Sequence, residues 1–166
     1  MARKPALSKE TLVALGAEKL AGLVLDEAMA NAGFKRRINA ALAGQSGPAA
    51  IAKLIDRRLA GLDRARGFID WDRVRTFRDD LQGLSDSIVK ELCPAAPALG
   101  FARLLRFIAT HERVFNRVDD SSGKMQDVYW QAIEAIGAAA AALSAADAAA
   151  VPEAVMAALG DTEHGY

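Results

Sequence analysis

The sequence predicts an all-α fold, and three observations lead to this class. Alanine is abundant and leucine is common, and both residues have high helix propensity. No stretch shows the alternation of apolar and polar residues that is typical of a β-strand. Apolar residues recur instead at spacings of three and four, which place them on one face of an α-helix. Glycine and proline fall between these stretches, and we expect seven to eight helices.

The N-terminal part of the chain is expected to form three short helices. Ser8 is a typical N-cap for the first, because its hydroxyl can accept a hydrogen bond from the backbone. A second helix is predicted over residues 17–30, and Asn31 interrupts the pattern that follows. Residues 34–43 then form a basic helix, which the glycine-containing stretch 44–47 ends.

A first long hairpin is predicted over residues 48–93. Pro48 suits the first position of a helix, where its missing N–H has no partner to lose. Gly67 ends this helix, and Asp70 is placed to cap the next, whose apolar stripe extends to Cys93. Because the connecting turn is short, the two helices should lie antiparallel.

A second long hairpin, residues 97–143, is expected to be the central packing unit. One face of its first helix has six residues at helical spacing: Phe101, Leu104, Ile108, His111, Phe115 and Val118. Residues 119–123 then break the pattern, since Asp, Ser and Gly favour turns and helix caps. The second helix has its own apolar stripe from Met125 to Leu143.

The two hairpins are similar in length and fall within the range of helical-repeat units, although their residues do not match. We therefore expect a single helical domain over residues 1–166, in which antiparallel hairpins stack as a short array similar to the α-solenoids of TPR and HEAT repeats. A last helix that begins near Pro152 has no partner after it. It would pack back on the body, become buried in a dimer, or mark the chain as the N-terminal part of a longer protein.

Composition excludes several classes of protein. With one cysteine, Cys93, the chain has no internal disulfide framework and no cysteine-based zinc site. The basic N-terminus lacks the apolar core of a signal peptide. The longest apolar run is far shorter than the roughly 20 residues of a membrane span. We expect a cytoplasmic protein that does not enter the membrane.

The net charge of zero conceals two halves of opposite charge. Residues 1–78 hold 15 Lys and Arg against 8 Asp and Glu, whereas residues 79–166 hold 6 against 13. Such halves can neutralise each other within one fold, meet head to tail between molecules, or present one basic surface to a partner such as nucleic acid.

An arginine edge runs along the predicted helix at 101–118 and consists of Arg103, Arg106, Arg113 and Arg117. It suits contacts with phosphate groups, but equally ion pairs with acids of a neighbouring helix, such as Asp79, Asp80 and Asp86. The basic patches 35–37 and 57–58 have the same two interpretations. A nucleic-acid surface usually adds strong net charge or exposed aromatic residues, and neither is evident here.

His111 and Glu112 begin like a zinc-protease motif, but Phe115 stands where the second histidine is required. Because His111 falls on the apolar stripe, we interpret it as a buried, hydrogen-bonded residue of the core. His164 is the second histidine of the chain and lies near its end. No metal site is therefore predicted.

The turn at 119–123 does not fit a calcium-binding EF-hand loop, which needs glycine at its sixth position and an acid at its twelfth. We expect Asp119 and Asp120 to end one helix, while Ser121 or Ser122 caps the next. Ion or ligand binding at this turn is the alternative interpretation.

Two tryptophans lie close to predicted turns, Trp71 after the Asp70 cap and Trp130 after the acidic turn. Core packing is the default interpretation of both. If the hairpins stack in register, both would instead lie near the same end of the array and form a recognition surface. The candidate interaction surface comprises Arg103, Arg106, Arg113, Arg117, Asp119, Asp120, Trp71 and Trp130.

Three segments resemble an uncharacterised bacterial family of all-helical domains: ETLVALGAEKLAGLVLDEA, ARGFIDWDRV and HERVFNRVDDSSGKMQDVYWQAIEA. The acidic Ser/Gly turn before an aromatic helix is the most specific feature, and the similarity extends over nearly the whole chain. Related helical segments accompany SWIM-type zinc fingers. The resemblance implies an all-α, repeat-like fold without an assigned activity, in a chain that is an N-terminal portion. A Cys/His zinc-finger signature does not occur here, so a zinc-linked role is not carried over.

The sequence contains no phosphate-cradling glycine-rich loop, no nucleophile elbow and no Cys–His pair, and we expect no cofactor. The leading interpretation is a non-enzymatic helical-repeat module that binds another protein along its groove, or self-associates through its C-terminal helix. A nucleic-acid-binding accessory domain that uses the basic N-terminal half is the alternative. A third interpretation is the helical part of a longer enzyme.

Overall fold

The computed structural model describes residues 6–121 and 123–160, and it confirms the all-α class. Across these residues, no helix is both long enough and apolar enough to cross a membrane. The helices in chain order are α1 (Lys9–Val13), α2 (Ala17–Ala30), α3 (Ala32–Gly44), α4 (Pro48–Arg64), α5 (Trp71–Asp86), the π-helix η1 (Ser87–Leu92), α6 (Cys93–Ala95), α7 (Pro97–Ala109), α8 (His111–Phe115), α9 (Lys124–Ala141), α10 (Ala145–Ala149) and α11 (Val151–Gly160).

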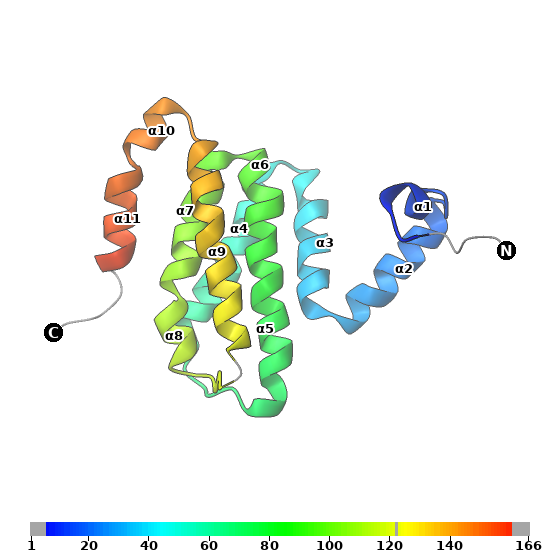
Figure 1. Cartoon of the computed structure of the whole chain (residues 1–166), viewed down its shortest axis with the longest axis horizontal. Helices are drawn as coiled ribbons and strands as arrows, with labels where there is room; N and C mark the ends of the chain where they lie inside the picture. The colour runs from blue at the N-terminus through cyan, green and yellow to red at the C-terminus, as the bar shows by residue number, and fades with distance from the viewer. Residues whose placement is uncertain (1–5, 122, 161–166) are drawn as a thin grey trace.

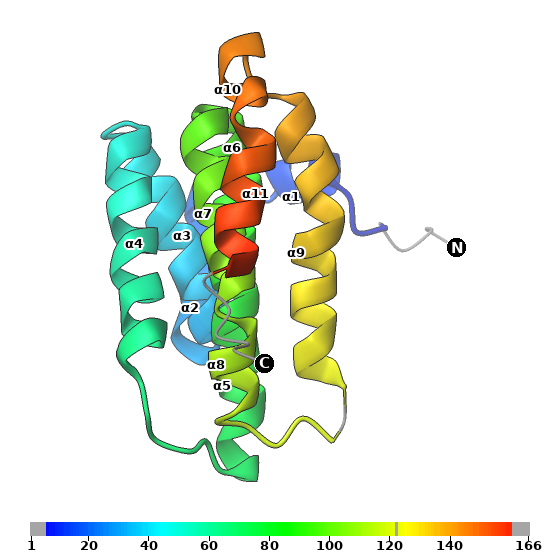
Figure 2. The same ribbon diagram turned by 90° about the vertical axis from the view of Figure 1, so that its left-hand side faces the viewer.

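The body of the molecule is a bundle in which α3, α4, α5, α7 and α9 lie side by side (Figures 1 and 2). These helices surround a shared apolar core, in which Leu59, Leu84, Leu104 and Tyr129 are each no more than 2% exposed. The bundle does not confirm the expected solenoid-like array. The division into helices likewise does not confirm the expected seven or eight, because several predicted helices are interrupted.

Two glycines bring α3 and α5 into close contact. A Cβ atom added to Gly33 would lie 1.8 Å from the backbone oxygen of Asp79, and one added to Gly83 would lie 2.2 Å from the backbone oxygen of Gly33. Both neighbours are backbone atoms, so a larger side chain would have to push the helices apart. The glycines therefore make α3 a direct neighbour of α5, although the hairpin connection joins α5 to α4.

Helix α5 continues directly into the π-helix η1, which lies within the bundle. At this junction the hydroxyl of Ser87 donates to the carbonyl of Gly83 at 2.7 Å. Beyond η1, Gly100 of α7 packs on Cys93, where an added Cβ would lie 2.6 Å from Sγ. Burial raises the pKa of the Cys93 thiol. Because π-turns inside long helices often occur at functional positions, the space beside η1 is a candidate site.

The long helix predicted over residues 101–118 is divided at Thr110 into α7 and α8. The Thr110 hydroxyl donates to the carbonyl of Phe107 at 2.6 Å, a contact with the preceding turn that bends a helix. Tyr129 of α9 packs on this joint, because its hydroxyl lies 3.0 Å from Oγ1 of Thr110 and its ring stacks on Phe107. The joint thus fixes the position of α9.

The two ends of the described chain differ in how they pack. After α10, helix α11 folds back so that Val151, Val155 and Ala158 pack against the core. Of the outcomes considered for the last helix, it therefore packs back on the body. By contrast, α1 and α2 project away from the bundle beyond α3 (Figure 1), and neither has a buried residue. We call α1 and α2, with the residues that connect them, the N-terminal arm.

Candidate functional site

The arginine edge lies on α7 and α8 and forms ion pairs with α4. Arg103 donates from Nε and a terminal nitrogen to the carboxylate of Asp56, at 3.2 and 2.8 Å. Arg106 and Arg113 donate to Asp63, at 2.9 and 3.3 Å. The arginine edge thus forms ion pairs with a neighbouring helix, which confirms one of its two interpretations. The acids belong to α4, however, and are not those named from the sequence. A phosphate group would have to compete with these pairs.

Arg117, the last member of the arginine edge, connects two loops at one end of the bundle. Its Nε donates to the carbonyl of Gly67 at 2.9 Å, and its own carbonyl accepts from the backbone N–H of Ile69 at 2.8 Å. Burial lowers the pKa of the Arg117 guanidinium, and the nearby positive charges of Arg58 and Arg66 lower it further. Its role is therefore to join the loop before α5 to the loop after α8.

The acidic turn caps α9. The carboxylate of Asp120 accepts from the backbone N–H groups of Met125 and Gln126, each at 3.0 Å, whereas Asp119 accepts from the N–H of Ser121. The positive end of the helix dipole also stabilises a negative charge at this position. The interpretation of the turn as a cap is confirmed.

The capping residue differs from the one predicted. Asp120 takes the place expected for a serine, because its longer side chain reaches across Gly123 to the first turn of α9. Ser122 lies outside the described residues. Neither aspartate ends the preceding helix, since α8 ends at Phe115. Gly123 adopts a left-handed conformation with φ of 69°, as a tight turn requires.

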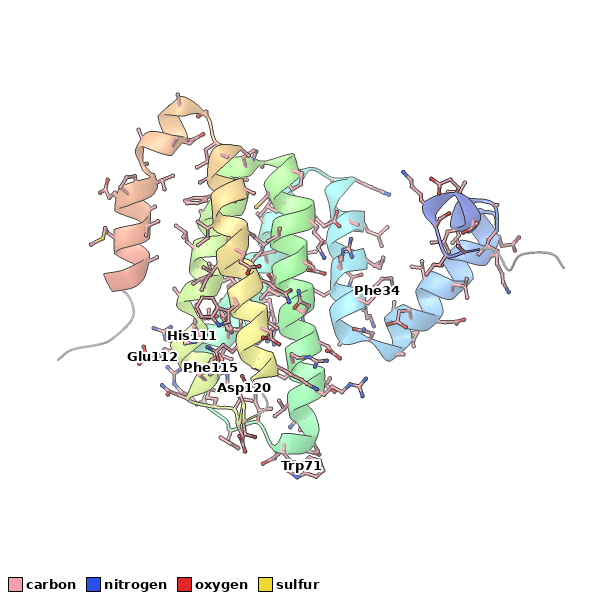
Figure 3. All side chains as sticks on the ribbon, viewed as in Figure 1. Phe34, Trp71, His111, Glu112, Phe115 and Asp120 are labelled. Carbon is pink, nitrogen blue, oxygen red and sulfur yellow. The ribbon has the colours of Figure 1, made fainter. Side chains whose placement is uncertain are left out.

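The two tryptophans are exposed, so their interpretation as core residues is wrong. Trp71 is 84% exposed and stands at the start of α5, at one tip of the body (Figure 3). Trp130 is 54% exposed and lies on α9, where it shares a hollow with Ala158 of α11. Trp71 is not among the residues that line this hollow, and a recognition surface shared by the two tryptophans stays a prediction.

His111 is exposed, which corrects its interpretation as a buried core residue. Because the helix is interrupted at Thr110, the apolar stripe of α7 does not continue evenly into α8. The ring of His111 still contacts other aromatic rings: its centroid lies 4.4 Å from that of Phe115 and 5.3 Å from that of Tyr129 (Figure 3). It stands at the edge of the core, beside the hollow that Trp130 lines.

This apolar hollow lies between α7, α8, α9 and α11 and has a volume of ≈ 400 Å³. The residues that line it are Ile108, Ala109, His111, Gln126, Tyr129, Trp130, Ile133 and Ala158. Ile133 belongs to the apolar stripe predicted between Met125 and Leu143, yet it is 41% exposed. Uncovered apolar side chains that line a concave surface are typical of a contact site.

A second apolar surface belongs to the N-terminal arm. On α2, Leu25 is 64% and Met29 82% exposed, and their spacing of four places them on one face of the helix. Leu23 is also exposed, and Leu20 and Val24 are only partly covered. The helix is thus apolar over a wide arc, but the bundle covers little of it.

A third surface is a basic cavity of ≈ 400 Å³ between α3, α4 and η1. Its polar lining residues are Lys35, Arg36, Asn39, Arg57, Arg58 and Ser87. Behind this lining, Asp80 of α5 is 9% exposed and pairs with both Arg36 and Arg58, the latter through Nε at 2.9 Å. The two basic patches seen in the sequence therefore face each other across one cavity.

The two basic patches are visible in the sequence, but their position beside each other was not predicted. The signal was their position around residues 44–47: Arg36 precedes this turn and Arg58 follows it at comparable distance along the chain. In an antiparallel helix pair, such residues lie side by side. The contribution of Asp80 had no comparable signal, since it depends on the close approach of α3 and α5 at their glycines.

No metal centre emerges from the described ranges, 6–121 and 123–160, where no three His, Cys, Asp or Glu side chains are grouped to hold an ion. His164 lies outside these ranges. The candidate sites are thus the N-terminal arm, the apolar hollow and the basic cavity.

The fold and these surfaces define an all-α bundle protein with an uncovered helical arm. The chain belongs to DUF6880, a family of unknown function whose model matches residues 2–166. Membership of an uncharacterised family is thereby confirmed over nearly the whole chain. No curated protein and no solved structure matches the chain.

Proposed function

We propose that the protein is a non-enzymatic interaction module whose N-terminal arm binds the apolar hollow of a second copy. This role keeps the leading interpretation of the sequence but changes the binding element. The C-terminal helix was expected to self-associate, yet α11 directs Val155 and Ala158 toward its own body. The uncovered helix is α2, at the other end of the described chain.

The observation that carries the proposal is that α2 has no buried residue although it carries five large apolar side chains: Leu20, Leu23, Val24, Leu25 and Met29. Burying exposed apolar surface contributes roughly 25 cal/mol per Å². A helix with Leu25 and Met29 facing water therefore gains free energy from any matching groove. Docking of an amphipathic helix into an apolar groove is a common mode of protein recognition.

A second copy is the favoured partner because the chain has both halves of such a contact. Trp130 and Ile133 expose apolar surface at the hollow, and Leu25 and Met29 expose it on the arm. The arm and the hollow lie on opposite sides of the bundle, so one molecule cannot join its own two surfaces (Figure 1). Two copies that exchange arms close a dimer, and a contact that does not close makes longer chains.

The test is the oligomeric state of the purified chain, measured by sedimentation equilibrium across a range of concentrations. We expect association of the unchanged protein and a monomer for the double variant Leu25→Lys/Met29→Lys, because two buried charges would be unpaired in the contact. Glu27→Lys is the matched control, since Glu27 is exposed on the opposite side of α2. A monomer at every concentration, or equal loss in the control, would contradict the proposal.

Four further predictions from the sequence are retained as part of this proposal. They are a helical-repeat organisation, a bacterial source, a cytoplasmic location and a relationship to domains that accompany SWIM-type zinc fingers. The alternative role in nucleic-acid binding loses part of its support, because Arg103, Arg106 and Arg113 are paired with α4. Four residues of the basic N-terminal half line the cavity between α3, α4 and η1: Lys35, Arg36, Arg57 and Arg58.

A further inference from the structure

We propose that the basic cavity binds the phosphate group of a phosphorylated small molecule. The cavity lies between α3, α4 and η1, apart from both the arm and the hollow. The inference is therefore independent of the proposed self-association.

Charge is the first argument for an anionic ligand. Four cationic side chains line the cavity, namely Lys35, Arg36, Arg57 and Arg58, and no acidic residue lines it. Asp80, which lies behind the lining residues, neutralises one of these charges, which leaves three in excess. Like charges that converge in a partly enclosed space repel one another, and a bound anion relieves this repulsion.

The cations fall into two groups with different roles. Asp80 holds Arg36 and Arg58 in fixed positions, so their guanidinium groups form an ordered floor. Lys35 and Arg57 are exposed, and neither pairs with an acid in the described part of the chain. These two side chains are free to move onto a ligand, and arginine suits the two-oxygen contact that a phosphate offers.

The floor is also incompletely satisfied. The Nε atom of Arg36 is buried and has no hydrogen-bond acceptor within residues 6–121 and 123–160. A buried donor without an acceptor costs free energy. A ligand oxygen within reach of this atom would remove the cost.

The shape of the cavity favours a small molecule over a nucleic-acid strand. Its ≈ 400 Å³ lies in the range of ligand pockets, and Leu54, Ile55 and Leu84 supply apolar wall. Asn39 adds a polar side chain to the lining, whereas the hydroxyl of Ser87 already donates to the carbonyl of Gly83. A strand would instead need a basic track that continues beyond the cavity, and the arginine edge of α7 and α8 is already paired.

The experiment is a calorimetric titration of the full chain with pyrophosphate, a probe that presents phosphate oxygens without a base or lipid. We expect saturable binding, weakened at least about tenfold in Lys35→Gln/Arg57→Gln, because two charge-assisted contacts are lost. The matched control is Lys53→Gln/Arg64→Gln, which removes the same charge from exposed residues of α4 outside the cavity. The control should bind pyrophosphate within about twofold of the unchanged protein.

A parallel titration with a single-stranded oligonucleotide separates the two sources of phosphate. Binding of pyrophosphate that depends on Lys35 and Arg57 but not on Lys53 and Arg64 supports the cavity. Absence of pyrophosphate binding at low salt overturns the proposal. Equal weakening in both double variants, or binding of the oligonucleotide alone, also overturns it, since the basic residues would then act as a diffuse surface. Helical content, measured by circular dichroism, verifies that each variant is folded.

Discussion

The direction of one buried hydrogen bond follows from its neighbours. The Thr110 hydroxyl has a single hydrogen, which it donates to the carbonyl of Phe107 at 2.6 Å. The Tyr129 hydroxyl, 3.0 Å away, must therefore be the donor to Oγ1 of Thr110. Burial raises the pKa of Tyr129. Tyr129 thus stays protonated in the folded protein and links α9 to the joint between α7 and α8.

This arrangement predicts a pH-dependent effect of Tyr129→Phe. Near neutral pH the substitution should lower the free energy of unfolding by about 1 kcal/mol, because Oγ1 of Thr110 loses its donor. The folded-state pKa of Tyr129 lies above the ordinary value, so its contribution is complete below pH ~10 and is lost as pH rises further. Above pH ~10 the unchanged protein should therefore lose stability faster than the variant. Urea unfolding of both proteins across this range measures the difference, and parallel pH profiles would contradict the assignment.

Among the helices, the crossing of α3 and α5 depends on glycine. Gly83→Ala would place a methyl group 2.2 Å from the backbone oxygen of Gly33. Because this neighbour is a backbone atom, the two helices would have to move apart. We expect a loss of about 3 kcal/mol or more in the free energy of unfolding. Gly137→Ala in α9 is the matched control, because its added methyl group meets no atom within 4 Å. The control should be neutral or stabilising by about 0.5–1 kcal/mol. Similar destabilisation by both variants would show that the close crossing is not the cause.

The cap of α9 gives a second prediction at the scale of an element. Asp120→Ala removes the acceptor of two backbone N–H groups in the first turn of α9. We expect a loss of about 1–2 kcal/mol in thermal or urea unfolding. Asp119→Ala removes one exposed hydrogen bond within the turn and should cost less than half of this. An equal cost for both substitutions would contradict the assignment of the cap.

Some features of the individual helices could be predicted from sequence patterns, and others could not. Asn31 and Pro48 mark helix boundaries in the structure because capping and proline geometry are local properties. The sequence could predict that the arginine edge forms ion pairs with acids of another helix. It could not predict which acids, because their identity depends on which helix lies beside α7. Asp56 and Asp63 are spaced by seven residues, as are Arg106 and Arg113, and this match was the available signal.

For the molecule as a whole, the class of fold followed from periodicity, whereas the arrangement of its helices did not. Apolar stripes indicate where a helix is covered, but Gly33 and Gly83 approach through backbone atoms that leave no stripe. The candidate sites depend on this arrangement. Lys35 and Arg57 meet only because α3 and α4 are neighbours, and Trp130 is exposed only because α11 leaves part of α9 uncovered.

The central claim is that the arm of one copy occupies the hollow of another, and a mixing experiment tests it most directly. The arm variant Leu25→Lys/Met29→Lys keeps an intact hollow. The hollow variant Trp130→Lys/Ile133→Lys keeps an intact arm. Each should be a monomer by sedimentation, since each lacks one half of the contact. Mixed together, they should form a one-to-one complex through the intact arm of one and the intact hollow of the other. Two variants that stay monomeric when mixed, or that still associate alone, would contradict the account.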